Sequence, residues 1–270
     1  GCHIYDSSNV LVATVTGDTA TKTLTGLSQS TKYGYYVKEY KGNNESAASA
    51  TIYAVTFATA LLDSNTVAWY DYLKSVTKDS NNYVSQWDDL STCGHHLSQN
   101  TDGLKPLLTS NGVLFDGSDD YMSVTFTNAQ PCYIYAVVRQ VTWKSEGYFW
   151  DGGPSNNSID LKQLDTTPGI KGYAGSGFTN QCNDLVINTF GIIRWHLNGA
   201  NSKLQVNKNT AITGNFGSLA GLGVKLGSQG INGHYGNVEF KEFIMRKVAD
   251  SDGSEAAIFN YLSQKHGFFF

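Results

Sequence analysis

Two kinds of side chain that sugar binding requires occur together in the stretch EGYFWDGGPSNNS. Tyr148 and Trp150 offer aromatic faces, and Asp151 and Asn156 offer a carboxylate and an amide close behind them. An aromatic ring can stack on a sugar ring while neighbouring polar groups bind the sugar hydroxyls. Tyr173, in the sequence KGYAGSG, can join them from an adjacent hairpin. We therefore predict a glycan-binding site built from these five residues.

The orientation of the two rings is left open by the sequence. Tyr148 and Trp150 alternate with Phe149, so a regular strand turns one of the two sets away from the core. The alternative is that Trp150 belongs to the core and that Asp151 is a turn residue, since aromatic side chains mostly pack inside. The ring that faces solvent is the one expected to stack on a sugar.

Three carboxylates lie close together in the segment DGSDD, at Asp116, Asp119 and Asp120. Asp and Gly are common in turns for backbone reasons alone, which favours a plain turn. Carboxylate oxygens are also ligands for calcium, which takes six to eight oxygen atoms. The same segment is therefore a candidate metal site.

The elements that must position these residues are mostly strands. From residue 61 to 246 the chain is a series of short runs rich in Val, Ile, Tyr and Phe, bounded by Gly, Asn, Asp or Ser. Short strands at regular spacing, without helices between them, predict an antiparallel sandwich. Asn198-Gly199, between two alternating segments, predicts a hairpin.

One helix is predicted, over residues 252–266. Asp252 is its N-cap and Glu255 follows three residues later, which is the arrangement of a capping box. Gly267 can take the left-handed conformation that ends a helix. This helix is expected to be structural.

Composition excludes two classes of partner. The chain of 270 residues has a net charge of −4, whereas nucleic-acid binding needs a concentrated cationic surface. It contains no apolar run of about 18 residues, so no membrane insertion is expected. The four cysteines have no CxxC spacing, which favours buried free thiols over a disulfide framework.

The segment GLSQSTKYGYYVKEYKGNNES resembles the second half of a fibronectin type III domain. Tyr33 stands where that fold, an immunoglobulin-like sandwich, places a corner tyrosine whose hydroxyl ties back to upstream backbone. The resemblance covers residues 1–59 and leaves no room for the first two strands. We expect a partial domain, the C-terminal part of a longer polypeptide, whose open edge is completed by upstream residues or a partner chain.

A second resemblance covers residues 60–270. The segments GVLFDGSDDYMSV, YIYAVVR, VKLGS and VEFKEFIMRKVADSDGSEAAIFNYLSQKHG resemble, in this order, those of concanavalin A-like, laminin-G-like jelly rolls. The fold class predicted for the chain is therefore all-β: an antiparallel β-sandwich (jelly roll) with one C-terminal helix, preceded by the partial sandwich. The resemblance implies no required cofactor and allows structural calcium at Asp116, Asp119 and Asp120.

The jelly-roll family includes glucanases, which place their acids on one face of a strand as Glu-x-Asp-x-Glu. No such run occurs in this sequence, and Glu239 and Glu242, three apart on a strand, should point to opposite faces. Asp88 and Asp89 are adjacent and diverge likewise. We therefore predict that the chain is not an enzyme.

The function predicted on these grounds is recognition at a surface. We expect a non-enzymatic adhesion module that binds cell-surface or extracellular glycans, at the C-terminal end of an extracellular or phage virion appendage protein. A purely structural virion fibre or decoration domain is the first alternative, and a glycan-degrading enzyme is the second. The expected location is extracellular or on the virion surface, with other virion or appendage proteins, or further copies of the chain, as partners.

Overall fold

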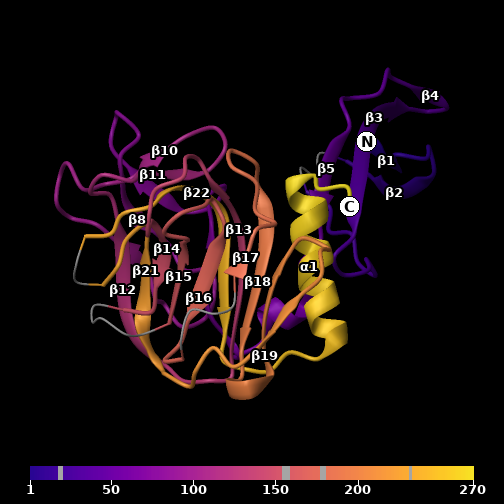
Figure 1. Ribbon diagram of the computed structural model, residues 1–270. Coiled ribbons are helices and arrows are strands. Elements are labelled where there is room, and N and C mark those ends of the chain that lie inside the picture. The colour runs from indigo at the N-terminus through magenta and orange to yellow at the C-terminus, as the bar shows by residue number, and fades with distance from the viewer. Residues whose placement is uncertain (18–20, 154–158, 177–180, 231–232) are drawn as a thin grey trace. The chain divides into compact units, whose positions relative to one another are not determined.

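The computed structural model describes residues 1–270 except 18–20, 154–158, 177–180 and 231–232 (Figure 1). Within the described residues every strand pair of the sheets is antiparallel, and the single α-helix is α1 (Asp252–His266), near the C-terminus. The prediction of an all-β antiparallel sandwich with one C-terminal helix is confirmed.

The chain forms two compact units. The small unit comprises Gly1–Leu62 with Asp252–Phe269, and the large unit comprises Asp63–Ser251 with Phe270. The helix α1 is thus grouped with the small unit. The domain boundaries expected from the sequence, 1–59 and 60–270, stay a prediction.

The small unit contains a five-stranded sheet and the 3-10 helix η1 (Thr59–Leu62). Tyr33 makes the contact predicted for a corner tyrosine, because its hydroxyl accepts a hydrogen bond from the Ser28 N–H at 2.9 Å. In spatial order the strands are β2 (Leu11–Val15), β1 (Cys2–Asp6), β3 (Lys32–Lys41) and β4 (Asn44–Glu45), with β5 (Ile52–Val55) also paired to β3.

The helix α1 follows the predicted caps. It begins at Asp252, and Gly267 directly after it has a φ of +73°, the left-handed conformation that ends a helix without a Cβ penalty. Within its own unit α1 lies against η1 and β5, and the ring of Tyr261 contacts that of Phe57 at 5.8 Å between centroids. No helix among the described residues combines the length and the apolar character needed to cross a membrane.

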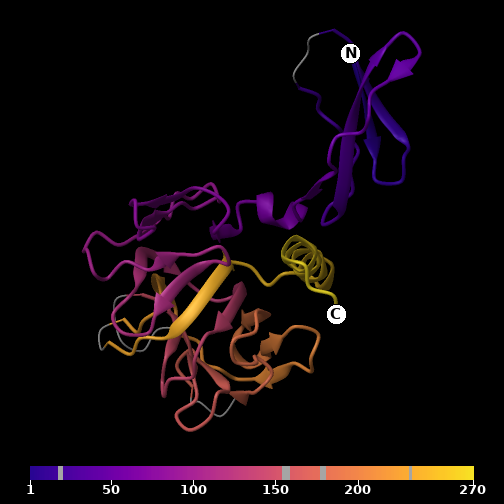
Figure 2. The same ribbon diagram turned by 90° about the horizontal axis from the view of Figure 1, so that it is seen from above.

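The large unit is a sandwich of two sheets, seen from the side in Figure 1 and from above in Figure 2. The eight-stranded sheet runs in the order β10 (Leu107–Leu108), β11 (Val113–Asp116), β22 (Asn237–Arg246), β13 (Cys132–Gln140), β18 (Gly191–Leu197), β19 (Ser202–Val206) and β20 (Ile212–Gly214), with β6 (Thr66–Asp71) also beside β22. The 3-10 helix η2 (Gly199–Asn201) turns the predicted Asn198-Gly199 hairpin between β18 and β19.

The second sheet of the sandwich has nine strands. Their order is β17 (Gln181–Cys182), β16 (Ile170–Tyr173), β15 (Asp160–Gln163), β14 (Tyr148–Asp151), β21 (Gly221–Leu226), β12 (Met122–Asn128), β9 (Leu97–Ser98), β8 (Val84–Trp87) and β7 (Val76–Lys78).

The core lies between the two sheets and is rich in aromatic rings. Trp150 of the nine-stranded sheet contacts Trp195 and Phe243 of the eight-stranded sheet, with centroid distances of 6.1 and 5.5 Å. Other core residues come from strand alternation. In β13, Ile134 and Ala136 enter the core, whereas the alternating residues Tyr133 and Tyr135 face the other way. Each aromatic pair adds about 0.5–1.5 kcal/mol beyond the area it buries.

The cysteines are free thiols, as predicted. Cys132 and Cys182 are buried, whereas Cys2 is half-buried and Cys93 is exposed. The expectation of burial is therefore confirmed for two of the four residues.

Candidate active site

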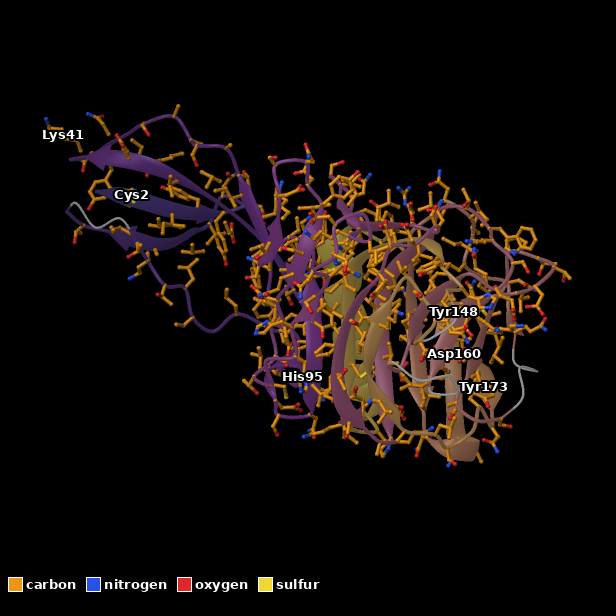
Figure 3. All side chains as sticks on the ribbon, turned by 90° about the vertical axis from the view of Figure 1, so that its left-hand side faces the viewer. Cys2, Lys41, His95, Tyr148, Asp160 and Tyr173 are labelled. Atoms are coloured by element: carbon orange, nitrogen blue, oxygen red, sulfur yellow. The ribbon has the colours of Figure 1, made fainter. Side chains whose placement is uncertain are left out.

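Four neighbouring strands of the nine-stranded sheet carry a row of polar side chains on the face turned away from the core. Strand register sets Asp151 of β14 opposite Lys225 of β21, and Asp160 of β15 opposite Tyr173 of β16. One step along the same strands, Lys162 lies opposite both Tyr148 and Lys171. We call this surface the polar face: Tyr148, Asp151, Asp160, Lys162, Lys171, Tyr173 and Lys225. Tyr148, Asp160 and Tyr173 are labelled close together in Figure 3.

A β-bulge decides which aromatic residue reaches the polar face. The register of β14 against β15 shifts between Tyr148 and Trp150, so Phe149 and Trp150 both enter the core. A bulge inserts an extra residue and breaks the two-residue alternation. Tyr148 and Asp151 therefore share the outer face, whereas Trp150 is fully buried in the core. Tyr148 is buried as well, with 3% exposed, so neither of the two rings faces solvent. The alternative expected for Trp150, a core position, is the one that the structure adopts.

The other predicted binding residues have different outcomes. Tyr148 and Asp151 lie on the polar face together with Tyr173, which is half-buried. Asn156 lies outside the described residues. The role of these residues in binding stays a prediction.

Two lysines of the polar face are neutralised by acids at its margin. Lys162 forms an ion pair with Glu146 at 2.6 Å, and Lys171 forms one with Asp165 at 2.7 Å. The Lys162 ammonium group also lies 5.2 Å from the centre of the Tyr148 ring. The lysine side chains are buried, so these contacts hold Tyr148 and the lysines in fixed positions.

Asp160 is the most strongly perturbed acid of the polar face. Its exposed fraction is 4%, and its Oδ1 atom has no hydrogen-bond partner among the described residues. Burial and, next to it, the negative charge of Asp151 raise the pKa of the Asp160 carboxyl to about 8, against the opposing effect of Lys162 and Lys171. At neutral pH this carboxyl therefore carries a proton.

Asp151 has a different environment, although its exposed fraction is only 1%. Its Oδ2 atom accepts a hydrogen bond from the Gly230 N–H at 3.0 Å. The residue opposite Asp151 on β21 is Lys225, whose ammonium group is cationic. Burial lowers the pKa of Lys225, and the charge of Asp151 opposes that shift.

The polar face adjoins a small cavity on the Lys225 side. This cavity has a volume of about 210 Å³ and is lined by Tyr121, Ser123, Thr125, Lys225 and Gly230 among others. The Lys225 ammonium group lies 4.2 Å from the centre of the Tyr121 ring. A protonated acid with a second acid on the neighbouring strand, next to a cavity, can perform acid–base chemistry on a bound ligand.

The candidate metal residues come together in the loop after β11. Asp116, Asp119 and Asp120 place carboxylate oxygens within 4.8 Å of one another. The loop is also the predicted turn, because Asp116 Oδ1 accepts the Ser118 N–H at 2.7 Å. Burial, with the charges of Asp116 and Asp119, raises the pKa of Asp120 to about 7. Three oxygen donors suit calcium, whose binding here stays a prediction.

The two glutamates of β22 do not lie as expected. Phe240 and Phe243 both enter the core, so the alternation of β22 slips between them, where its register against β13 shifts. Glu239 and Glu242 precede these two residues and thus share the outer face, which corrects the prediction that they point to opposite faces. Glu239 binds Arg139, with 2.7 Å from Nε to Oε2, and Glu242 accepts the Trp69 indole N–H at 2.7 Å.

Both glutamates are fully buried and already bonded, so they act as structural groups. Asp160 was not among the site residues predicted from the sequence. A signal for it exists in SIDLKQL, where Asp160 and Lys162 alternate with Leu161, and in IKGY, where Lys171 and Tyr173 do the same. Two adjacent strands with polar residues at every second position indicate a shared polar face.

No protein-family model matches the chain, and no curated protein matches it. Several solved structures share its fold. An arabinofuranosidase complexed with arabinofuranosyl-alpha-1,2-xylobiose has a TM-score of 0.53 and 16% identity, over 68% of this chain and 51% of the arabinofuranosidase. Trypanosoma rangeli sialidase in complex with the inhibitor DANA has a TM-score of 0.55 and 12% identity, over 86% of this chain and 43% of the sialidase.

These identities show a common fold, and the chain spans about half the length of the structures it matches, or less. The resemblance to concanavalin A-like, laminin-G-like and fibronectin type III domains stays a prediction. The prediction that the chain is not an enzyme is corrected by these comparisons, because the structures that share its fold are named as an arabinofuranosidase and a sialidase. The prediction rested on acids that are close in sequence along one strand. Asp151 and Asp160 instead lie on two neighbouring strands, β14 and β15.

Proposed function

We propose that the large unit binds a glycan over the polar face and hydrolyses a glycosidic bond there. Asp160 is the general acid and Asp151 is the second carboxylate. The observation that carries this proposal is the buried Asp160 carboxyl, which has an unpartnered oxygen among the described residues and a pKa of about 8. An acid that keeps its proton at neutral pH can donate it to a leaving oxygen.

In this proposal Asp160 enters the reaction protonated and Asp151 enters it ionised. Asp160 donates its proton to the glycosidic oxygen as the bond to the anomeric carbon breaks. We assign Asp151 as the nucleophile, which attacks the anomeric carbon and forms an ester. Asp160, now ionised, takes a proton from the water that hydrolyses this ester.

The choice of a glycan as substrate has separate support. Proteins named as arabinofuranosidase and sialidase share the fold, and Tyr148 provides an aromatic side chain at the edge of the acid pair. The extracellular or virion-surface location, the virion or appendage partners and a homo-oligomer stay predictions from the sequence resemblance.

The test is hydrolysis by the whole chain. Release of reducing ends from a panel of plant and bacterial polysaccharides, and of fluorophore from aryl arabinofuranosides and aryl sialosides, finds the substrate. Asp160→Asn and Asp151→Asn should each lower turnover by about 10²-fold or more, since general acid catalysis contributes about 10²–10⁴-fold.

Asp102→Asn is the control, because Asp102 is an exposed acid outside the polar face and should leave turnover nearly unchanged. Equal turnover in the parent and in both folded site variants would refute the assignment. No release from any substrate of the panel would count against hydrolysis itself.

A further inference from the structure

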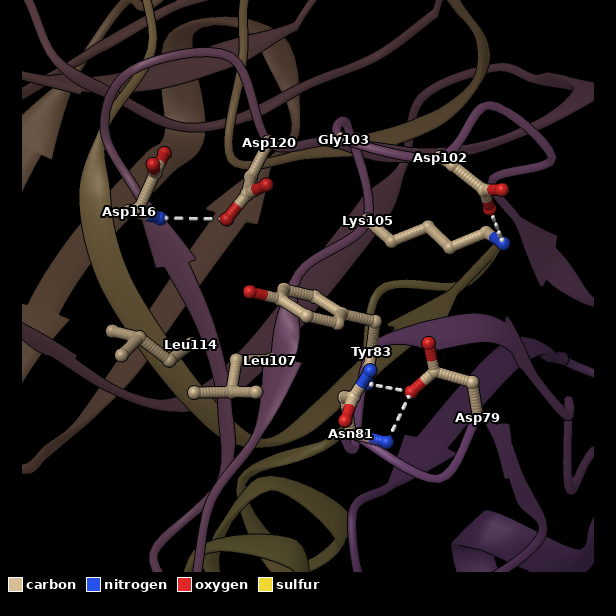
Figure 4. Close-up of a pocket in the computed structure, with 10 residues that line it drawn as sticks. All are labelled: Asp79, Asn81, Tyr83, Asp102, Gly103, Lys105, Leu107, Leu114, Asp116 and Asp120. Atoms are coloured by element: carbon tan, nitrogen blue, oxygen red, sulfur yellow. Dashed lines mark hydrogen bonds and ion pairs between the residues drawn. The ribbon is translucent and has the colours of Figure 1, made fainter.

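A second concave site lies at an edge of the large unit, on β10 and β11, the turn between β7 and β8, and the neighbouring loops (Figure 4). Its volume is about 550 Å³, within the range of about 300–1,000 Å³ usual for small-molecule sites. We call it the edge pocket, and its lining residues are Asp79, Asn81, Tyr83, Asp102, Gly103, Lys105, Leu107, Leu114, Asp116 and Asp120.

The edge pocket is separate from the polar face. In the nine-stranded sheet, β21, β12 and β9 stand between β14, which carries Asp151, and β8, next to Tyr83. Neighbouring strands lie about 4.8 Å apart, so β14 and β8 are about 20 Å from each other across the sheet. The Asp120 end of the edge pocket is nearer, since Tyr121, the next residue, lines the cavity beside Lys225. A ligand in the edge pocket is therefore outside the proposed hydrolytic centre.

Tyr83 provides a rigid, exposed ring in the edge pocket. The exposed fraction of the residue is 45%, and Figure 4 shows its ring between the two groups of aspartates. Its backbone is held by Asp79 on both sides: the Tyr83 N–H donates to Asp79 Oδ1 at 2.9 Å, and the Asp79 N–H donates to the Tyr83 carbonyl at 3.1 Å. Tyr83 also pairs with Leu107 through an isolated bridge. An ordered backbone at Tyr83 reduces the entropy that is lost when a ligand stacks on its ring.

Hydrogen-bond acceptors surround this ring. Asp79 uses Oδ1 for the turn, where it also accepts the Asn81 N–H at 2.8 Å, and Asp120 uses Oδ2 for the Asp116 N–H at 3.0 Å. Each of these two carboxylates has a second oxygen that can accept a hydroxyl or ammonium proton from a ligand. Leu107 and Leu114 are half-buried and supply apolar surface beside the ring.

The charge of the edge pocket selects among ligands. Its acids are Asp79, Asp102, Asp116 and Asp120, and its one ammonium group, on Lys105, is already paired with Asp102. Burial raises the pKa of Asp120 to about 7, so that residue is only partly ionised at neutral pH. Uncompensated carboxylates repel an anionic ligand and attract a cationic one. Hydroxyl-rich rings with an apolar face suit the combination of Tyr83, the two leucines and the acceptors.

We propose that the edge pocket is a second carbohydrate site that binds an uncharged or amino-substituted sugar ring, with Tyr83 as the stacking residue and Asp79 and Asp120 as acceptors. The site excludes acidic sugars. It is a binding site only and does not depend on hydrolysis at Asp160.

The experiment measures the binding of methyl glucoside, glucosamine and glucuronate to the whole chain, by saturation-transfer NMR and titration calorimetry in the presence of EDTA. Methyl glucoside or glucosamine should bind, with glucuronate at least about fivefold weaker. Tyr83→Ala should weaken binding about fivefold or more, and Tyr83→Phe, which keeps the ring, should stay within about twofold of the parent.

Two controls separate this site from the polar face and from general surface effects. Asp160→Asn should bind these sugars as the parent does, so that failure of hydrolysis and failure of this site are distinguishable. Tyr53→Ala removes an exposed tyrosine of the small unit and should also bind like the parent. The proposal is overturned if none of the sugars binds, if glucuronate binds best, or if the folded Tyr83→Ala protein binds as well as the parent.

Discussion

Asp160 on the polar face and Asp102 at the edge pocket are the same residue type in opposite environments. Asp160 is buried beside another acid, and its pKa rises to about 8. Asp102 is exposed, and its hydrogen bond and ion pair with Lys105 lower its pKa. Burial penalises the charged form, whereas an accessible cation favours it. The first environment suits a proton donor, whereas the second keeps the Asp102 carboxylate ionised and paired with Lys105, so the comparison shows that burial separates these two acids.

The largest expected effect comes from removing the support of the polar face. Trp150→Ala should lower the free energy of unfolding by about 3–5 kcal/mol, because it deletes a fully buried ring between the sheets. Urea unfolding measures this loss. Tyr148→Ala is the comparison, and an equal loss in both variants would contradict the different positions assigned to the two rings.

The pH dependence of stability tests the buried acid itself. The folded state holds the Asp160 proton up to a pH of about 8, whereas the unfolded chain releases it near the ordinary value of 3.8. Stability contributed by this group is therefore lost as the pH rises between these values. Asp160→Asn should raise the melting temperature by about a few degrees more at pH ~9 than at pH ~5.

The control for this measurement is Asp165, for which the expected change of stability with pH has the opposite sign. The pKa of Asp165 is lowered, first by its hydrogen bond to Lys171, so its contribution is lost as the pH falls. Asp165→Asn should cost a little stability near neutral pH and less in acid. If both variants show the same pH trend, burial does not separate the two acids.

Calcium tests the loop at the margin of the edge pocket. If Asp116, Asp119 and Asp120 hold the ion in the folded state only, saturating calcium should raise the melting temperature relative to EDTA, with up to about 2.7 kcal/mol at 100 times the dissociation constant. Asp119→Asn should abolish most of this rise. Equal melting temperatures with calcium and with EDTA would remove the metal interpretation and leave the turn.

The smallest effect expected is at Asp102. Asp102→Asn removes one exposed carboxylate and frees the Lys105 ammonium group, so the discrimination between glucosamine and glucuronate should fall about twofold. Competition titration of the two sugars measures it. A variant that keeps the full discrimination would show that the other carboxylates alone set the preference.

Local features of this fold follow from the sequence. Asp252 and Gly267 mark the ends of α1, Asn198-Gly199 marks a hairpin, and the hydroxyl of Tyr33 ties back to the Ser28 backbone. Such features depend on residues a few positions apart, because caps, turns and strand alternation use short-range hydrogen bonds and a fixed period. The class of the fold, an antiparallel sandwich with one helix, followed from the same signals.

The candidate site was decided by tertiary structure. Because of a bulge after Tyr148, Trp150 lies in the core, and because of a register shift in β22, Glu239 and Glu242 lie on one face. Neither irregularity has a local signal in these residues, because each depends on how two strands meet. The pKa of Asp160 depends likewise on burial and on Asp151 across the next strand. The sequence contains the acids, but the free energy that separates their protonation states arises only when distant strands exclude water together.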